Sequence, residues 1–175
     1  MRRRVIYLVI GVAVLSVGWY LFRPELLFIN KTVDEELPGA ATSRSVAGTD
    51  AAVVSSGSFQ GLAHETKGVA AIHRLPDGKR ILRLTEFETS NGPDVRVYLV
   101  AAPDAKDDET VKRAGFIDLG SMKGNRGNQN YALPPDTNLS KYQSVSIWCR
   151  RFGVNFGAAS LAPQQPKGGQ QGAPG

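Results

Sequence analysis

The chain has 175 residues, which is enough for one domain of ordinary size. It carries 21 Lys and Arg against 16 Asp and Glu, a net charge of +5, and four of the arginines flank an apolar run near the N-terminus. The excess of basic over acidic residues therefore indicates membrane topology rather than a nucleic-acid partner. Length and charge together exclude a large multidomain enzyme and argue against binding to nucleic acid.

Residues 1–22 predict a basic cytosolic tip and a transmembrane anchor. After the arginines at positions 2–4, Val5 to Phe22 is a run of 18 residues without a charge. A helix of that length spans roughly 27 Å, close to the thickness of a bilayer's hydrocarbon core. Because Lys and Arg are retained on the cytosolic side, we expect the rest of the chain on the extracytoplasmic side, at the cell surface or in the periplasm.

A cleaved signal peptide is the alternative interpretation of this run. Signal peptidase requires small residues at its cleavage site, whereas the run ends in Trp19, Tyr20, Leu21 and Phe22. We therefore expect an uncleaved single-pass anchor.

The segments on either side of the predicted domain have the composition of flexible chain. Residues 23–56 show neither a helical nor a strand period, and small polar residues at 38–43 and 48–50 are typical of a linker. Residues 163–175 are almost entirely Gly, Pro and Gln, which predicts a disordered tail. The predicted folded domain is therefore 57–162.

Short apolar runs between turn residues predict that this domain is all-β, either an antiparallel β-sandwich or a small barrel. Pro76–Arg80 predicts a hairpin turn. In the turn Ser90–Asp94, we expect Gly92 to adopt a conformation before proline that other residues enter reluctantly. A short helical turn is expected at Asp107–Ala114. The expected strands are Val69–Leu75, Ile81–Phe87, Val95–Val100, Phe116–Leu119, Tyr131–Leu133, Ser144–Arg150 and Val154–Leu161.

Cys149 is the single cysteine, so the chain forms no intramolecular disulfide and has no Cys-x-x-Cys motif. Alternation along its strand places Cys149 on one face with Val145 and Ile147, which predicts that it points into the core. A buried free cysteine commonly acts as a small apolar side chain. The alternative is a redox thiol or a ligand to a prosthetic group. An unpaired cysteine on the oxidising side of a membrane is a liability, so its presence there suggests a function.

Other chemical motifs are weak. His64 and His73 share no metal-binding spacing, so no zinc site is predicted. The sequence contains no nucleophile elbow, phosphate loop or dinucleotide motif, and Gly124-Asn-Arg-Gly127 predicts a turn. A haem or another prosthetic group has no ligand motif to support it, so the cofactor stays open.

Several short motifs in chain order carry a resemblance to a known family. They are Gly57-x-Phe59, Gly68-x-Ala70, Asn91-Gly92-Pro93-Asp94, Val97-Tyr98-Leu99, Gly127-x-Gln129-x-Tyr131 and Ser144-Val145-x-Ile147-Trp148-Cys149. Together they resemble the electron-transfer DM-thirteen domain over about Ser56 to Ala162. The resemblance implies a β-rich extracytoplasmic module, in animals often joined to haem-binding domains. It also implies that Cys149 is the family's characteristic cysteine, proposed to act in electron transfer as a bare thiol or through a prosthetic group.

The sequence thus supports two functional hypotheses. The first is a membrane-tethered extracytoplasmic domain with a redox role through Cys149 and a redox protein as its partner. The second is a non-catalytic module that binds a ligand or a protein, in which Cys149 is part of the core. Neither hypothesis identifies an electron donor or acceptor.

Overall fold

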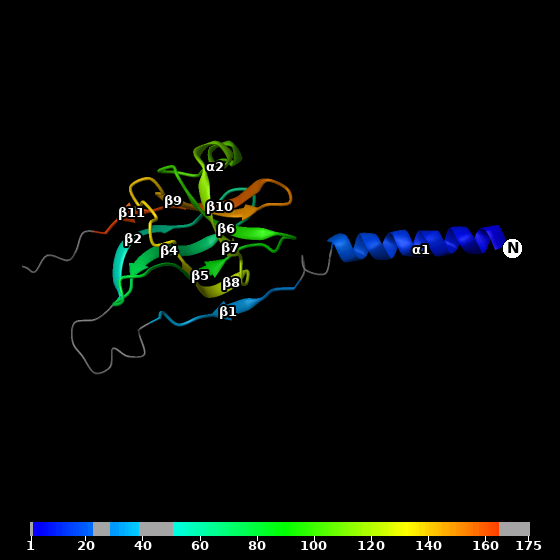
Figure 1. Ribbon diagram of the computed structural model, residues 1–175, viewed down its shortest axis with the longest axis horizontal. Helices are drawn as coiled ribbons and strands as arrows, with labels where there is room; N and C mark the ends of the chain where they lie inside the picture. Colours follow the sequence, from blue (N-terminus) through cyan, green and yellow to red (C-terminus); the bar gives the residue numbers. More distant parts are fainter. Residues whose placement is uncertain (1, 23–28, 39–50, 165–175) are drawn as a thin grey trace, which may run out of the picture.

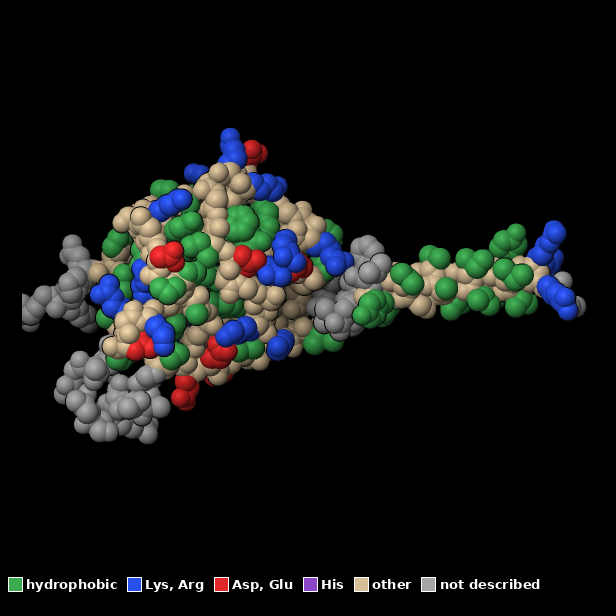
Figure 2. Space-filling model, in the orientation of Figure 1, with side chains coloured by type: hydrophobic (Ala, Val, Ile, Leu, Met, Phe, Trp, Pro, Cys, Tyr) green, Lys and Arg blue, Asp and Glu red, His purple; other side chains and the backbone are tan. Residues whose placement is uncertain are grey.

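The computed structural model describes residues 2–22, 29–38 and 51–164 (Figure 1). Helix α1 (Arg2–Phe22) is long and apolar enough to cross a membrane, and a signal sequence near the N-terminus would share both properties. Its apolar side chains are exposed along the helix, and Lys or Arg side chains mark the N-terminal tip (Figure 2). The helix therefore buries no face against other described residues.

The rest of the described chain forms two sheets, so the expected β-sandwich is confirmed and the barrel is not formed. The first sheet has the order β1-β8-β5-β4-β2-β11 and the second β3-β10-β9-β6-β7. The first sheet contains β1 (Thr32–Asp34), β2 (Ala52–Ser58), β4 (Lys67–Arg74), β5 (Arg80–Glu88), β8 (Arg126–Ala132) and β11 (Ala162–Pro163). The second contains β3 (Gln60–Gly61), β6 (Val95–Val100), β7 (Phe116–Ser121), β9 (Ser144–Cys149) and β10 (Val154–Ser160). Neighbouring strands pair antiparallel, except that β1 pairs parallel with β8.

Strand alternation divides the apolar side chains between two clusters. Side chains on the inner faces of both sheets meet in the main core, to which β6 contributes Val95, Val97 and Leu99. The alternate residues of β6, Tyr98 and Val100, lie on the outer face and form a second cluster under helix α2 (Asp108–Ala114). This helix confirms the expected helical turn. Asp107 caps it, accepting a hydrogen bond from the Thr110 amide at 2.6 Å.

The segment 23–56 was predicted to be an irregular linker, but its described parts contain strand β1 and most of strand β2. Within 29–38, strand β1 pairs with β8, and β2 begins at Ala52. A Cβ on Gly124 would collide with the Lys31 carbonyl oxygen, and one on Gly127 with the Val33 carbonyl oxygen. The motif predicted as a simple turn is therefore the surface on which β1 lies. At the other terminus, Pro163 and Gln164 of the predicted tail pair with β2, and the remainder lies outside the described residues.

Candidate functional site

Cys149 is the last residue of β9 and is fully buried, with no exposed surface. Its register partners are Val95 on β6 and Val154 on β10, so two valines flank the sulfur within the sheet. It belongs to the main core together with Val145 and Ile147. The prediction that Cys149 points inward is confirmed. A partner molecule in solution therefore has no direct path to the thiol in this conformation.

Directly beyond Cys149, the chain is fastened to the turn that precedes β6. The Arg150 amide donates to the Asp94 carbonyl oxygen at 2.9 Å, and the Arg150 guanidinium bonds the Asp94 carboxylate at 2.7 Å. We call these two contacts the Arg150–Asp94 clamp. Arg96 bonds the same carboxylate at 3.1 Å. Burial alone would raise the pKa of Asp94, but the hydrogen bonds from Arg96 and Arg150 prevail and hold the pKa below its usual value.

Gly92 occupies the turn for a reason other than the one predicted. Its backbone is not in the left-handed region, so the expected strain before proline is wrong as an explanation. A Cβ at this position would lie 2.7 Å from Val95 Cγ2 and 3.1 Å from Phe156 Cζ. Both neighbours belong to the core that contains Cys149. Glycine is therefore required by close packing against the core.

A pocket of about 410 Å³ opens beside this turn, and we call it the Met122 pocket. Val95 and Met122 line it, and both also pack in the core with Cys149. Its remaining lining comes from residues 29–31, 91–94 and 121–125. The pocket is thus separated from Cys149 by core side chains such as Val95. Its wall is partly apolar, and lysines and amides lie around it, as in many sites for small amphipathic ligands.

Buried polar side chains hold the loop between β7 and β8 against this pocket. Gln129 Oε1 accepts hydrogen bonds from the Lys123 amide at 3.2 Å and from the Tyr131 hydroxyl at 2.8 Å. Gln129 Nε2 donates to the Gly124 carbonyl oxygen at 2.8 Å. Burial raises the pKa of Tyr131 to about 12, so its hydroxyl stays protonated as a donor. This network fixes the loop that carries Met122.

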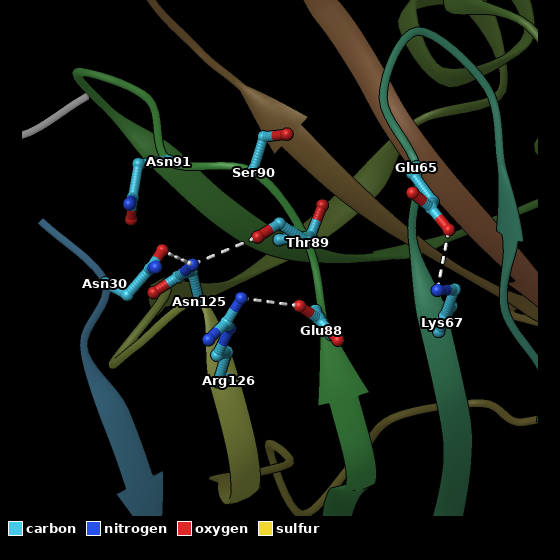
Figure 3. Close-up of a pocket in the computed structure, with 9 residues that line it drawn as sticks. All are labelled: Asn30, Glu65, Lys67, Glu88, Thr89, Ser90, Asn91, Asn125 and Arg126. Atoms are coloured by element: carbon cyan, nitrogen blue, oxygen red, sulfur yellow. Dashed lines mark hydrogen bonds and ion pairs between the residues drawn. The ribbon is translucent and has the colours of Figure 1, made fainter. Parts of the chain in front are cut away.

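A second, more polar pocket of about 260 Å³ lies next to the first, and we call it the Asn125 pocket (Figure 3). Asn125 is buried; its amide nitrogen donates to Asn30 Oδ1 at 2.8 Å and to the Thr89 carbonyl oxygen at 3.1 Å. Two ion pairs also line the pocket: Glu88–Arg126 next to Asn125, and Glu65–Lys67 on the opposite side (Figure 3). Asn30, Asn91 and Asn125 line both pockets. Such a set of amides and paired charges suits a polar ligand that offers several hydrogen-bonding groups.

Both pockets and Cys149 lie at the same end of the sandwich. We call it the pocket end, and it consists of residues 29–31, 61–66, 89–94, 121–125 and 150–153. The opposite, or distal, end carries the turn 75–79 and the connection 133–143. Helix α2 lies on the outer face of β9 and β10, where Asp108 accepts a hydrogen bond from the Asn155 amide at 2.7 Å. Sequence reasoning found the turn at 90–94 and Cys149. It missed the amide-lined pockets, which unite segments up to 95 positions apart in the chain.

The two histidines do not form a site with Cys149. The His64 ring contacts the Phe156 ring at the pocket end, with centroids 3.9 Å apart and the ring planes tilted by 46°. His73 lies half-buried on β4, where burial and then the positive charge of Arg83 lower its pKa. Among the described residues, no group of three or more His, Cys, Asp or Glu side chains could hold a metal ion.

The surroundings of Cys149 also bear on a prosthetic group held by its sulfur. An axial thiolate must face the cavity that holds a haem. Cys149 lines neither pocket and is enclosed by core side chains. In this arrangement the residues do not fit a haem ligated by Cys149.

Comparison with known families identifies the β-sandwich. A family model described as electron transfer DM13 matches residues 58–161, more than half of the chain. The match includes Cys149 and every segment of the pocket end except 29–31. Comparison with curated proteins finds no match, and comparison with solved structures finds none either.

Proposed function

Because the chain belongs to the electron transfer DM13 family, we propose that it is a membrane-tethered extracytoplasmic redox protein in which Cys149 is the reacting group. Family membership gives the domain an electron-transfer kind of role. The membrane position and the role of the cysteine are the proposed part. The family match across a domain with a single cysteine is the observation that carries the proposal.

The proposed step is thiol–disulfide exchange with a redox partner. The Cys149 thiol loses its proton to solvent, and the thiolate attacks one sulfur of the partner's disulfide. A Cys149–partner disulfide bond forms, the partner's S–S bond breaks, and the second partner sulfur leaves as a thiolate. Cys149 is thereby oxidised and the leaving sulfur is reduced.

This step requires the pocket end to open, because the sulfur has no exposed surface in the closed conformation. The Arg150–Asp94 clamp joins the turn after Cys149 to the turn before Val95. Loss of the clamp would release the turn after Cys149 from the turn before Val95, the neighbour of Cys149 on β6. The clamp therefore sets how often Cys149 becomes reachable, and local opening of this kind is common at functional sites.

The test uses the full chain in detergent micelles and an aromatic disulfide whose leaving thiolate absorbs visible light. Native protein should release the thiolate slowly, and unfolded protein should release it at once. Arg150→Gln removes a half-exposed ion pair and should accelerate the reaction about two- to fivefold, the range for pairs of this kind. Lys79→Gln removes the Lys79–Asp77 pair at the distal end and is the matched control. Equal rates in both variants and the native chain would contradict the role of the clamp.

The redox role itself is tested with Cys149→Ser. Val97→Thr is the matched control, because it also places a hydroxyl in the fully buried core. Each variant should lose about 1–3 kcal/mol of stability for a buried hydroxyl without a partner. Reduction of a disulfide substrate should disappear in Cys149→Ser and persist in Val97→Thr. Parallel losses in the two variants would indicate that the cysteine only fills the core.

Complete burial of Cys149 beside two pockets favours a second candidate function, a binding module with a structural cysteine. In that case the ligand would occupy the Met122 or the Asn125 pocket. Cys149→Ser would then retain binding in proportion to the folded fraction. Asn125→Ala, which removes the buried amide between the pockets, would abolish binding.

A further inference from the structure

The pocket end carries the point at which the chain from α1 joins the sandwich. The side-chain nitrogen Nδ2 of Asn91 donates to the Ile29 carbonyl oxygen at 2.8 Å. Asn125 Oδ1 accepts from the Lys31 amide at 2.7 Å, and Asn125 Nδ2 donates to Asn30 at 2.8 Å. Two side chains of the domain thus hold three successive residues of the incoming chain. We call the chain from Phe22 to Ile29 the tether, and its Ile29 end is fixed at the pockets.

The length of the tether limits how the domain can stand on a membrane. Seven residue steps separate Phe22, the end of α1, from Ile29. A chain extends at most about 3.6 Å per residue, so Ile29 lies within about 25 Å of the end of the membrane helix. Strand β4 has eight residues and runs from Lys67 at the pocket end to Arg74 at the distal end. Its seven steps at roughly 3.3 Å each give a length of about 23 Å.

These two lengths disfavour contact between the distal end and the bilayer. If the turn 75–79 lay on the membrane, the pocket end would stand at least one strand length above it. The tether would then have to be almost fully extended, at a high cost in conformational entropy. With the pocket end toward the membrane, the distance that the tether must span is well below its maximum length.

The surface of the pocket end has features that suit an anionic lipid surface. Phe152 lies in the turn between β9 and β10 with 62% of its surface exposed, and Arg150 and Arg151 beside it are exposed. The five segments of the pocket end contain four basic and two acidic residues, a net charge of +2. The two segments of the distal end contain two basic and two acidic residues, a net charge of zero. Basic residues are attracted to an anionic lipid surface, and exposed apolar side chains such as Phe enter the boundary between headgroups and acyl chains.

We propose that the pocket end lies against the lipid surface, with Phe152 at the level of the headgroups and Arg150 and Arg151 next to anionic lipid. This inference rests on the retained anchor of the proposed function and does not depend on the chemistry of Cys149. Its consequence is that both pockets open at the membrane surface. A molecule that reaches them approaches from the membrane side.

The test places a fluorescent label at either end of the full chain in vesicles of phosphatidylcholine and phosphatidylglycerol. The label is attached to Arg151→Cys or to Asp77→Cys, and the native chain, with only buried Cys149, provides the background. The vesicles contain lipid with a nitroxide on its headgroup, which quenches fluorophores at close range. Quenching at position 151 should be several times stronger than at position 77. Equal quenching, or stronger quenching at 77, would overturn the proposal.

Two further variants test the contact itself. Phe152→Ser should reduce quenching at position 151. Phe116→Ser is the control, because Phe116 is also exposed but lies at the distal end, stacked on Tyr98. Unchanged quenching in Phe152→Ser would exclude an inserted Phe152. A chain that fails to float with the vesicles would overturn the anchor, whereas the disulfide assay decides the role of Cys149 separately.

Discussion

Replacement of Gly127 by alanine should detach strand β1 from the sandwich. Gly127 has φ +96° and Gly78 has φ +83°, so alanine meets a similar backbone penalty of about 1–2 kcal/mol at either position. The two sites differ in their neighbours. A Cβ on Gly78 has open space around it, whereas a Cβ on Gly127 collides with the Val33 carbonyl oxygen. Gly78→Ala is therefore the matched control for the contact with β1.

The additional loss in Gly127→Ala follows from the bonds that hold β1. Among them, the Glu35 amide donates to the Asn128 carbonyl oxygen at 2.9 Å, and Lys123 pairs with the Glu35 carboxylate at 2.7 Å. Net values near 1 kcal/mol per hydrogen bond place the extra loss at about 2–4 kcal/mol. Urea unfolding of the full chain measures both variants, and hydrogen exchange at the Glu35 amide reports β1 directly. Equal destabilisation, with the Glu35 amide still protected, would refute the reasoning.

Three other predictions follow from the pocket end and the anchor. Gly92→Val should lower stability by about 1–3 kcal/mol through overpacking against Val95 and Phe156, and an unchanged melting temperature would contradict the packing. Because the pKa of Asp94 is lowered, its carboxylate stabilises the fold above about pH 4, the usual unfolded pKa, and this contribution disappears as the pH falls further. Asp94→Asn should therefore be less stable than the native chain at neutral pH, with the difference closing in acid; a constant difference would argue against the ion pairs. Protease added to intact cells should cleave beyond Phe22 while the N-terminal fragment stays in the membrane fraction, and recovery of a soluble chain that begins between positions 20 and 45 would exclude the uncleaved anchor.

The strands of the sandwich were predictable because their patterns are local. Alternation in Val95–Val100 and Ser144–Cys149 indicates which side chains enter the main core, and the turn residues at 76–80 and 90–94 delimit the strands. The other face of both strands is also largely buried, and the apolar side chains there form the second cluster under α2. Strand β8 was predicted too short, because its N-terminal half is polar. Asn128 and Asn130 face β1 there, and Gln129 is buried among polar partners.

Strand β1 could not be predicted, because it has three residues and its partners lie far away in the sequence. Its side chains give no apolar period, and polar contacts to residues more than 85 positions away hold it in place. The signal was present only in Gly124 and Gly127, whose spacing is also typical of a turn. The pockets were missed for the same reason, since Asn30 and Asn125 become neighbours only through this pairing.

The inward position of Cys149 was predictable from strand phase, but its enclosure was not. Alternation gives the face of a sheet on which a residue lies; it does not show that Val95 and Val154 flank the sulfur or that Arg150 fastens the next turn. Because of those features, the redox role proposed for Cys149 requires a step in which the pocket end opens.

The measurement that tests the central claim most directly is an anaerobic redox titration of the purified full chain in lipid, with Cys149→Ser beside it. The titration counts the electrons that each folded chain exchanges with a thiol–disulfide buffer. The native chain should form a mixed disulfide reversibly at Cys149 while remaining folded, and Cys149→Ser should fold and exchange nothing. A native chain that exchanges no electrons until it unfolds, or a serine variant that exchanges as many as the native chain, would contradict a redox role for Cys149.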